Sequence, residues 1–515
     1  MKNNIGLFLA KRAHISPNVE AYVDADTRER YTFAELNLRC NQCAHALTEV
    51  GVKVGDRVAL LMMNGNEFVE AYFAIAKIGA VVVPLNWRLV ADELTFILKD
   101  SGSTTLIYGG QFANVVKTLH DGGAESTHIT TWIHVGDSDT RDDFGQDYKA
   151  LLDAAPTDEP TIGAEGHDLL YIMYTSGTTG LPKGAVHTHE TATWACITLG
   201  TTTDQYYKDR YLLALPLYHV GALAPLTSAV HQGVTCVVMP AFDPTQVWEL
   251  IQEERITSML AVPAMLNFMM QVPAKDECDF STLRWIMSGA APVPVTFIEA
   301  YDKMGIEIHQ VYGLTETCGP ACLTLADDAI EKAGSTGKAF FHTDVRVVDS
   351  EDNDVAPDEP GEVIVAGKHI MKEYWNRPEA TAETIRDGWL YTGDVAVVDK
   401  DGFIYIQDRT KDMIISGGEN VYPAEIENVI LQHPEVAEVA VIGLPSDKWG
   451  ESPLAVVVRK SESLAKEEII GHCKGKLAPF KLPKEVEFVD EIPRNPTGKI
   501  LKRILREEFP GPAAD

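Results

Sequence analysis

The chain has 515 residues, of which 45% are hydrophobic and 23% are charged. One hydrophobic core does not organise this length, since single cores stop growing at roughly 250–300 residues, and the composition is neither disordered nor fibrous. The formal net charge is −31, from 75 acidic and 44 basic residues, so the molecule as a whole repels nucleic acid and anionic membrane. We therefore expect several domains and no nucleic-acid partner, and any anionic ligand must be held by local geometry.

Cysteines are sparse, and long apolar runs are absent. No signal peptide precedes the eight cysteines, so we expect a reducing cytoplasm. The spacing Cys40-x-x-Cys43 is half of a metal or redox site, but no second pair follows at the spacing of a zinc site. We interpret the pair as part of a helix. The apolar run 5–10 is far shorter than the ~20 residues that span a bilayer, so we expect no membrane-spanning helix.

Short apolar runs alternate with helical patterns over most of the first 330 residues. A helix is predicted at 32–50, where Thr32 and Glu35 have the spacing of a capping box. Periodicity predicts further helices at 66–78, 91–99 and 244–254. Buried strands are predicted at 57–62, 81–85, 105–108, 169–173, 211–215, 235–239 and 258–262. This alternation predicts α/β subdomains with largely parallel sheets.

The pattern changes twice toward the C-terminus. From about residue 337 short β-rich segments at 345–349, 361–366 and 403–407 predict a small, barrel-like subdomain. From about residue 411 the prediction is a helix at 423–433, strands at 436–443 and 455–459, a helix at 465–477 and a strand at 485–488. About 100 residues suffice to fold alone, so we expect an N-terminal domain at 1–410 and a small α+β domain at 411–515. The tail after Glu508 is expected to fray.

The most informative stretch is Tyr-Thr-Ser-Gly-Thr-Thr-Gly-Leu-Pro-Lys-Gly, from Tyr174 to Gly184. Glycines let backbone amides approach a phosphate, while hydroxyls and a lysine add donors and charge, so the stretch predicts a polyphosphate-binding loop. Pro182 and Gly184 exclude a Walker A loop, which has a glycine and a hydroxyl residue at those places. The candidate phosphate-binding residues are Thr175, Ser176, Gly177, Thr178, Thr179, Gly180 and Lys183.

This loop resembles the phosphate-binding signature of the adenylate-forming superfamily, which comprises acyl-CoA synthetases, firefly luciferases and the adenylation domains of peptide synthetases. Four further matches follow in the order of that family: Tyr312-Gly-Leu-Thr-Glu316, Tyr391-Thr-Gly-Asp394, Asp408-Arg-Thr-Lys-Asp412 running into Ser416-Gly-Gly-Glu-Asn420, and Pro493-Arg-Asn-Pro-Thr-Gly-Lys499. The resemblance covers nearly the whole chain and is strongest to bacterial long- and very-long-chain fatty-acyl-CoA synthetases. It implies that a carboxylic acid and ATP form an acyl adenylate and pyrophosphate, and that coenzyme A then displaces AMP.

The resemblance assigns roles to residues of these motifs. Glu316 and Thr175 are expected to hold Mg²⁺, for which oxygen ligands are suitable. Lys499 is expected to bridge the carboxylate and the α-phosphate, Tyr312 to stack on adenine, and Asp394 to bind the ribose diol. The other nucleotide contacts that it implies are Gly289, Ala290, Ala291, Gln310, Val311, Gly313, Thr315 and Arg409.

The resemblance also implies a moving C-terminal domain. Lys411 is similar to the hinge of the family, about which the small domain rotates after adenylation. That rotation withdraws Lys499 and brings Gly417 and Gly418 toward the thioester site, where glycines leave room for the pantetheine arm.

The stretch Leu-Pro-Leu-Tyr-His-Val-Gly-Ala at 215–222 concerns the acyl group. The resemblance places His219, with Tyr218 and Val220, at the mouth of the acyl pocket, whereas a satisfied core histidine is the alternative. Peptide-synthetase domains have an aspartate in this region that holds a substrate amine, and the run 218–226 contains none. An amino-acid substrate is therefore disfavoured.

Three functions stay open. The first is a fatty-acyl-CoA synthetase, the second an aryl- or alicyclic-acid CoA ligase, and the third a nucleotide-binding homologue without turnover, which the intact Lys499, Glu316 and Asp394 disfavour. We expect free coenzyme A as the acceptor, because the tail offers no Gly-x-Ser carrier attachment site. Acyl chain length and oligomeric state stay open, with a homodimer as one option. A locally basic segment after His472 adds the hypothesis of weak peripheral contact with the inner face of the membrane.

Overall fold

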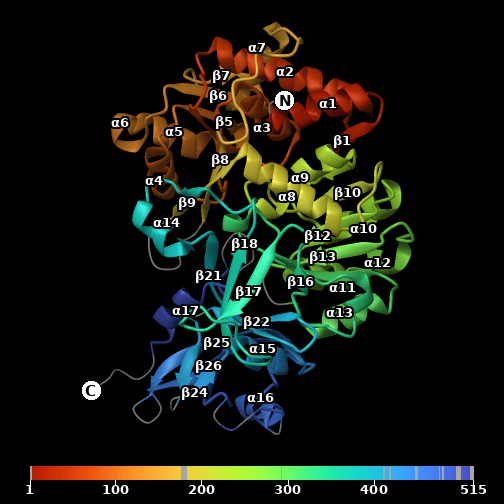
Figure 1. Cartoon of the computed structure of the whole chain (residues 1–515), viewed down its shortest axis with the longest axis vertical. Helices are drawn as coiled ribbons and strands as arrows, with labels where there is room; N and C mark the ends of the chain where they lie inside the picture. The colour runs from red at the N-terminus through yellow and green to blue at the C-terminus, as the bar shows by residue number, and fades with distance from the viewer. Residues whose placement is uncertain are drawn as a thin grey trace.

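The computed structural model describes residues 3–175, 182–290, 293–409, 412–416, 419–446, 450–474, 476–477, 479, 481–494 and 500–510. The strands in these ranges form four sheets, two large and two small, with helices packed on the large sheets (Figure 1). The predicted α/β class with parallel-rich sheets is confirmed.

One large sheet has eight strands. They are β3 (Arg57–Leu61), β4 (Val81–Pro84), β5 (Thr105–Gly109), β6 (Thr131–Val135), β7 (Gln146–Asp147), β8 (Leu169–Thr175), β9 (Lys183–Thr188) and β19 (Glu373–Tyr374). Their order is β19-β9-β8-β4-β3-β5-β6-β7. The strands from β8 to β7 run parallel, whereas β9 and β19 run antiparallel at one edge. At that edge β9, the strand after the phosphate loop, pairs with β19, which comes about 190 residues later in the chain.

The other large sheet has nine strands. They are β1 (Glu20–Asp24), β2 (Arg30–Thr32), β10 (Arg210–Leu213), β11 (Thr235–Val238), β12 (Ser258–Ala261), β13 (Trp285–Ser288), β14 (Glu307–Tyr312), β15 (Cys322–Leu323) and β16 (Lys338–Ala339). Their order is β16-β15-β14-β13-β12-β10-β11-β1-β2, and the central strands from β1 to β14 run parallel. The carboxyl ends of β13 and β14 therefore lie at the same edge.

Helices of the first 384 residues pack on and between these sheets. They are α1 (Gly6–Ile15), α2 (Phe33–Glu49), α3 (Asn66–Ile78), α4 (Ala91–Ser101), α5 (Ala113–Asp121), α6 (Gly123–Ser126), α7 (Tyr148–Ala154), α8 (His189–Thr202), α9 (Val220–Gln232), α10 (Pro244–Glu253), α11 (Pro263–Gln271), α12 (Ala274–Glu277), α13 (Val295–Asp302) and α14 (Pro378–Thr384). Thr32 and Glu35 form the predicted capping box of α2. The helices α8 and α9 lie between the two large sheets, and one hydrophobic core joins them to β8 and β10 (Figure 1).

The pair Cys40 and Cys43 is part of that core. Both residues lie on α2, and both are fully buried, so the interpretation as a helical pair is confirmed.

Among the described residues, none of the helices has both the length and the apolar composition that a membrane span requires.

The β-rich part is a five-stranded antiparallel sheet. It contains β17 (Asp344–Val348), β18 (Gly361–Ala366), β20 (Ile385–Arg386), β21 (Trp389–Val398) and β22 (Ile404–Arg409). Its core packs against Ala321 and Cys322 at the end of the nine-stranded sheet. This contact brings β21 beside the end of β14.

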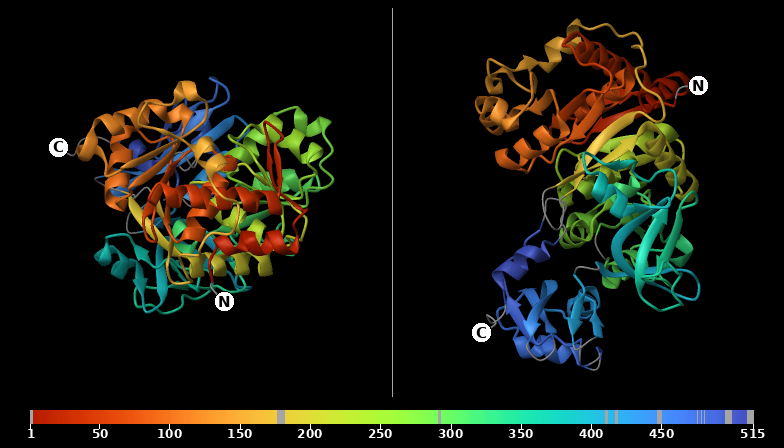
Figure 2. Two further views of the ribbon diagram at one scale, coloured as in Figure 1. Left: turned by 90° about the horizontal axis from the view of Figure 1, so that it is seen from above. Right: turned by 60° about the vertical axis from the view of Figure 1, so that its left-hand side comes forward.

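The last part of the chain has a sheet of its own. Its elements are β23 (Ile414–Ser416), β24 (Glu419–Val421), α15 (Pro423–Leu431), β25 (Val436–Ser446), β26 (Gly450–Arg459), α16 (Lys466–Cys473), β27 (Glu485–Phe488) and α17 (Lys502–Glu508). They lie at the end of the molecule opposite the N-terminal helices (Figure 2). The helix predicted at 465–477 ends at Cys473, because Lys474 takes an extended backbone conformation.

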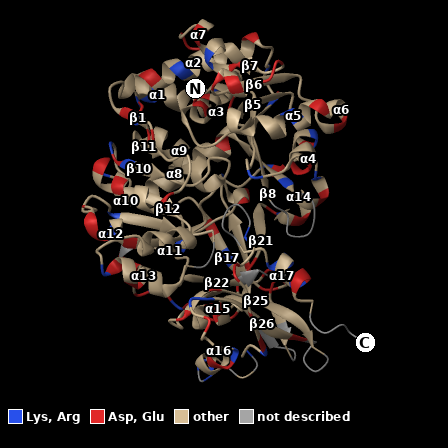
Figure 3. Ribbon diagram, turned by 180° about the vertical axis from the view of Figure 1, so that it is seen from behind, with Lys and Arg blue, Asp and Glu red and all other residues tan. Residues whose placement is uncertain are grey.

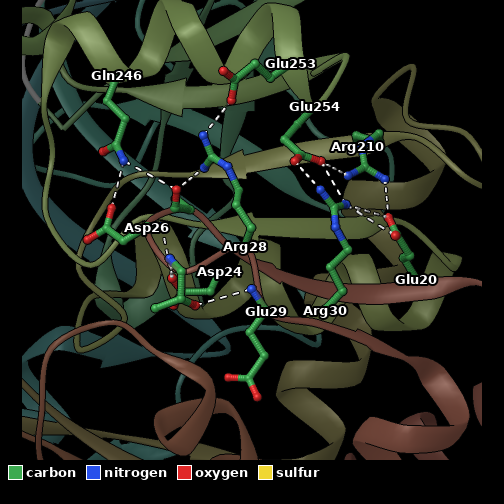
Figure 4. A network of polar contacts seen from close by, with 12 residues as sticks. Glu20, Asp24, Asp26, Arg28, Glu29, Arg30, Arg210, Gln246, Glu253 and Glu254 are labelled. Atoms are coloured by element: carbon green, nitrogen blue, oxygen red, sulfur yellow. Dashed lines mark hydrogen bonds and ion pairs between the residues drawn. The ribbon is translucent and has the colours of Figure 1, made fainter.

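Charges on the outside of the molecule are mostly acidic. Figure 3 shows acidic residues on outer helices such as α6, α10 and α12. One cluster contains both acidic and basic side chains. In it, Glu254 at the end of α10 accepts hydrogen bonds from Arg30 of β2 and Arg210 of β10 (Figure 4). Arg210 also pairs with Glu20 at 2.7 Å. The cluster holds the β1–β2 hairpin to the rest of the sheet and contains no residue of the predicted motifs.

Candidate active site

The strands β8 and β9 form the two sides of the predicted phosphate loop. They pair up to Thr175 and Lys183, and Thr175 Oγ1 donates a hydrogen bond to the Lys183 carbonyl oxygen at 3.4 Å. The residues between them that the sequence singled out lie outside the described residues: Ser176, Gly177, Thr178, Thr179 and Gly180. The hairpin therefore holds the first hydroxyl and the lysine of the motif side by side.

The ends of β13 and β14 bring the predicted adenine-binding segments to one edge. Ser288 pairs with Gln310, whose Nε2 donates a hydrogen bond to the Ser335 carbonyl oxygen at 2.6 Å. A Cβ atom on Gly289 would lie 2.2 Å from the Val311 carbonyl oxygen, so this close approach requires glycine. Ala290 follows with a φ of 67°, and Ala291 lies outside the described residues.

Tyr312 and Asp394 meet at this edge. The Tyr312 hydroxyl donates a hydrogen bond to Asp394 Oδ2 at 2.7 Å, and Asp394 is only 5% exposed. Burial and the charge of Asp394 raise the pKa of Tyr312 well above its usual value, so its hydroxyl stays a donor. The β21–β22 pairing places the backbone of Arg409 opposite Asp394, and the Arg409 side chain lies outside the described residues. Tyr312, the candidate for adenine stacking, and Asp394, the candidate for ribose binding, are therefore in direct contact.

Glu316 lies on a short turn, η3 (Thr315–Thr317), that follows β14. A Cβ atom on Gly313 would lie 1.5 Å from the Gly319 carbonyl oxygen, so the start and end of the turn touch there and require glycine. Glu316 Oε1 accepts a hydrogen bond from the Tyr374 hydroxyl at 2.7 Å. The Glu316 carbonyl oxygen accepts another from the Met371 amide at 2.8 Å. Sequence reasoning did not single out Tyr374 or Met371.

Tyr374 links this turn to the phosphate hairpin. It lies on β19 and pairs with Ala185 of β9, and Lys183 Nζ lies 5.1 Å from the centroid of its ring. Contacts therefore run from Thr175 through Lys183 and Tyr374 to Glu316. No local pattern in the sequence indicates this role of Tyr374, because the role depends on the pairing of β19 with β9.

The donor set around this chain of contacts fits Mg²⁺. Glu316 and Thr175 offer a carboxylate and a hydroxyl, and Mg²⁺ is usually held by one or two carboxylates together with substrate phosphates and water. Within the described ranges no cluster of three or more His, Cys, Asp or Glu side chains could hold a metal. A magnesium ion held by Glu316 and Thr175 would take its remaining ligands from nucleotide phosphates and water.

Two buried histidines hold the Glu316 turn, and sequence reasoning missed both. His187 Nε2, on β9, lies 2.7 Å from the Thr315 carbonyl oxygen. His369 comes after β18 in the chain, and its Nδ1 lies 2.8 Å from the Thr317 carbonyl oxygen. Burial lowers the pKa of each histidine to about 4, so both imidazoles are neutral near pH 7.

His219 lies at the start of α9, between Tyr218 and Val220. Arg88 donates a hydrogen bond to the Tyr218 hydroxyl at 3.1 Å. Burial, with the charge of Arg88, lowers the pKa of His219 to about 3, so the ring is neutral. Its Nε2 is buried and has no hydrogen-bond partner among the described residues, in contrast to a satisfied core histidine. A ligand group or a water is needed to satisfy it.

A small void of about 10 Å³, roughly the space of one water molecule, lies between β8, α3, α8, α9 and the end of the Glu316 turn. Two of its polar groups are already paired with each other, the Tyr72 hydroxyl and Thr227 Oγ1 at 3.0 Å. The lining residues, none of them charged among those described, are Tyr72, Tyr171, Ala192, Ala195, Cys196, Leu223, Ala224, Thr227 and Cys318. The lining is therefore largely apolar, and the void itself is too small to hold an acyl chain.

Four predicted residues of the C-terminal part lie outside the described residues: Lys411, Gly417, Gly418 and Lys499. The chain on both sides of the lysine turn is described. Arg494 and Ile500 form an antiparallel bridge, and Arg494 donates a hydrogen bond to Glu438 at 2.8 Å. The base of the turn is therefore anchored to β25.

The basic segment after His472 is largely paired with acids. Its ion pairs are Lys481–Glu425 at 2.6 Å, Arg494–Glu438 at 2.8 Å, Lys502–Glu427 at 3.0 Å, Arg503–Glu507 at 2.8 Å and Arg506–Asp412 at 2.9 Å. The positive charge that this segment presents is therefore smaller than its composition indicates.

Known proteins are similar to this chain over most of its length. The family described as AMP-binding enzyme matches residues 9–375, and the AMP-binding enzyme C-terminal domain matches residues 425–499. The chain is 48% identical over 507 residues to the long-chain-fatty-acid–CoA ligase FadD13 of Mycobacterium tuberculosis (strain ATCC 25618 / H37Rv), covering 98% of each. It is 40% identical over 512 residues to a feruloyl-CoA synthase of Amycolatopsis sp, covering 99% of this chain and 100% of the relative. A solved structure of a Mycobacterium tuberculosis fatty acyl CoA synthetase is similar with a TM-score of 0.80 and 47% identity, covering 98% of each chain.

Proposed function

The chain belongs to the AMP-binding enzyme family, and from this premise we propose that it joins a fatty acid to coenzyme A at the expense of ATP. The protein is an AMP-forming acid–CoA ligase, as the resemblance of its motifs implies. The observation that carries the proposal is the chain of contacts from Lys183 through Tyr374 to Glu316, which joins the phosphate hairpin to the turn with the candidate metal ligand.

In the first step a carboxylate oxygen forms a bond to the α-phosphorus, and pyrophosphate leaves. Both reactants are anions, so positive charge must be concentrated where they meet. Lys183 binds phosphate oxygens, and Lys499 bridges the carboxylate and the α-phosphate. Glu316 and Thr175 would hold Mg²⁺, which when bound neutralises phosphate charge. Asp394 accepts hydrogen bonds from the ribose, and its contact with Tyr312 supports a stacking role of that ring beside the sugar.

In the second step the sulfur of coenzyme A forms a bond to the acyl carbon, AMP leaves, and the thiol proton passes to solvent. We propose that the domain from about residue 411 rotates about Lys411 between the two steps. Lys499 then leaves the site, and Gly417 and Gly418 line the path of the pantetheine arm. The bridge between Arg494 and Ile500 and the contact of Arg494 with Glu438 support this, because they show that the chain on both sides of the lysine motif belongs to the small domain.

The mostly apolar side chains beside the Glu316 turn support an apolar acid, for which they would have to move apart. This lining holds no carboxylate to pair with a substrate amine. The buried Nε2 of His219, which has no hydrogen-bond partner among the described residues, supports its proposed role at the mouth of the acyl pocket. An aryl-acid ligase is the second candidate. The aromatic rings of Tyr72 and Tyr171 in the lining and the similarity to a feruloyl-CoA synthase favour it.

Pyrophosphate release separates the two candidates. The purified protein is given ATP, Mg²⁺ and coenzyme A with saturated acids of increasing length, benzoic acid, ferulic acid and an amino acid, and kcat/KM is measured for each. We expect the highest kcat/KM with a saturated acid and none with the amino acid. A higher value with ferulic or benzoic acid would establish the aryl candidate instead, and no acyl-CoA product from any acid would refute the proposal.

A further inference from the structure

We propose that His187 and His369 are positioning residues that hold the Glu316 turn in the conformation in which its carboxylate serves the nucleotide and its metal. The inference rests on the proposed role of Glu316, and it concerns two residues outside all five sequence motifs. Each histidine binds a carbonyl oxygen directly beside Glu316, His187 that of Thr315 and His369 that of Thr317.

Two segments of the chain hold the turn. His187 of β9 binds the carbonyl oxygen of Thr315, and the segment after β18 binds those of Glu316, through the Met371 amide, and Thr317, through His369. His187 lies in the eight-stranded sheet, the turn follows β14 of the nine-stranded sheet, and His369 follows β18 of the antiparallel sheet. The orientation of Glu316 is thus set where three sheets meet.

The turn needs such support because its own backbone is irregular. Cys318, directly after η3, has a φ of 56°, and Gly319 has a φ of 111°, so no regular helix continues to hold the carbonyl oxygens. A displacement of about 1 Å at a reacting centre can reduce a rate roughly 100-fold. Loss of one of these hydrogen bonds should therefore affect catalysis more than it affects folding.

The hydrogen-bond partners determine which ring nitrogen carries the proton. A carbonyl oxygen only accepts, so the N–H of His187 is on Nε2 and the N–H of His369 is on Nδ1. The other nitrogen of His369 faces Thr343 Oγ1 at 2.7 Å, and that of His187 faces Thr191 Oγ1 at 3.2 Å. Both histidines are 0% exposed. The donor position therefore differs between the two residues, although the side chain is the same.

This difference allows a matched pair of substitutions at each site. Gln carries an amide donor close to the place of histidine Nε2, and Asn close to that of Nδ1. We expect His187→Gln and His369→Asn to keep kcat/KM for MgATP within about threefold of wild type, since one hydrogen bond is retained. We expect the exchanged variants, His187→Asn and His369→Gln, to lower it roughly 10- to 100-fold.

A readout without turnover accompanies the kinetics. The melting temperature of the protein is measured with a non-hydrolysable ATP analogue, once with Mg²⁺ and once with EDTA. The increase caused by Mg²⁺ reports metal binding by the folded protein. We expect this rise to persist in the two matched variants and to vanish in the exchanged ones.

Thr343→Val, which removes only the partner of His369 Nε2, should lower kcat/KM about fivefold. His134→Gln is the control, because this buried histidine lies on β6, remote from β9 in the sheet, and bonds Thr140.

The outcomes separate this inference from the proposed function. Wild-type protein without acyl-CoA product refutes the function, and loss of magnesium dependence in Glu316→Gln tests the metal role by itself. With active wild type and an impaired Glu316→Gln, equal behaviour of all four histidine variants overturns the inference, because the donor position then has no effect. Should an exchanged variant not fold, unchanged kinetics of Thr343→Val overturns the part that concerns His369. The expected split between matched and exchanged variants, with His134→Gln near wild type, supports it.

Discussion

Replacement of Tyr374 by Phe removes one hydroxyl from the centre of the proposed site. That hydroxyl donates a hydrogen bond to Glu316 Oε1 at 2.7 Å, and Tyr374 is only 8% exposed. The ring stays, and with it the contact with Lys183 Nζ at 5.1 Å. The substitution therefore tests the link to Glu316 separately from the link to the phosphate loop.

The expected magnitude follows from the type of bond. A hydrogen bond to a charged group contributes about 1.5–3 kcal/mol, and each 1.36 kcal/mol corresponds to about a factor of ten. We therefore expect Tyr374→Phe to lower kcat/KM for MgATP roughly 10- to 100-fold. Tyr374→Leu should lower it further, because it also removes the ring beside Lys183, a contact of about 0.5–2 kcal/mol.

The assay is pyrophosphate release at saturating acid and coenzyme A with ATP and Mg²⁺ varied, together with urea unfolding of each variant. Tyr301→Phe is the matched control, because the buried Tyr301 hydroxyl bonds the Leu266 carbonyl oxygen at 2.9 Å on another part of the fold. Tyr301→Phe should lose about 1 kcal/mol of unfolding free energy and Tyr374→Phe about 1.5–3 kcal/mol, and only Tyr374→Phe should lose activity. Unchanged kcat/KM in Tyr374→Phe, or an equal loss in both variants, would refute the reasoning.

Three further predictions use other parts of the chain. Lys499→Ala should abolish acyl-adenylate formation and leave the reaction of supplied acyl-AMP with coenzyme A largely intact, which quenched single-turnover assays measure; equal loss of both half-reactions would contradict it. Burial lowers the pKa of His189 from 6.5 to about 4, so the histidine binds a proton more tightly in the unfolded chain than in the folded protein. About 3 kcal/mol of the free energy of unfolding that is present above pH 6.5 should therefore be lost as the pH falls toward 4. His189→Asn keeps an acceptor for the Ile5 amide and should flatten that pH dependence in urea unfolding, and an unchanged slope would show that other groups dominate. Because most basic residues after His472 have acidic partners, sedimentation with anionic vesicles should be weak and vanish near physiological salt, and binding that persists there would favour the membrane hypothesis.

Local patterns determined the elements of the fold. The capping box of Thr32 and Glu35, the helical period of 66–78 and the apolar runs at 57–62 and 169–173 depend on neighbours in the sequence, and each appears in the structure where it was predicted. The helix predicted at 465–477 was too long, because the helical period alone does not indicate the extended backbone at Lys474. The motifs with Thr175, Tyr312, Glu316 and Asp394 also pointed to the family and to its chemistry before any contact was known.

Only the tertiary structure decided how these motifs support one another. Tyr374, His187 and His369 belong to no motif. Tyr374 contacts Glu316 and the histidines contact the residues on either side of it, through a strand pairing or a packing contact between segments far apart in the chain. A histidine in a strand or a loop, or a tyrosine on a short strand, has no local signature that says which carbonyl oxygen or carboxylate it will meet. Such contacts arise because the sheets bury their faces against one another, and the sequence specifies that packing only through all of its residues together.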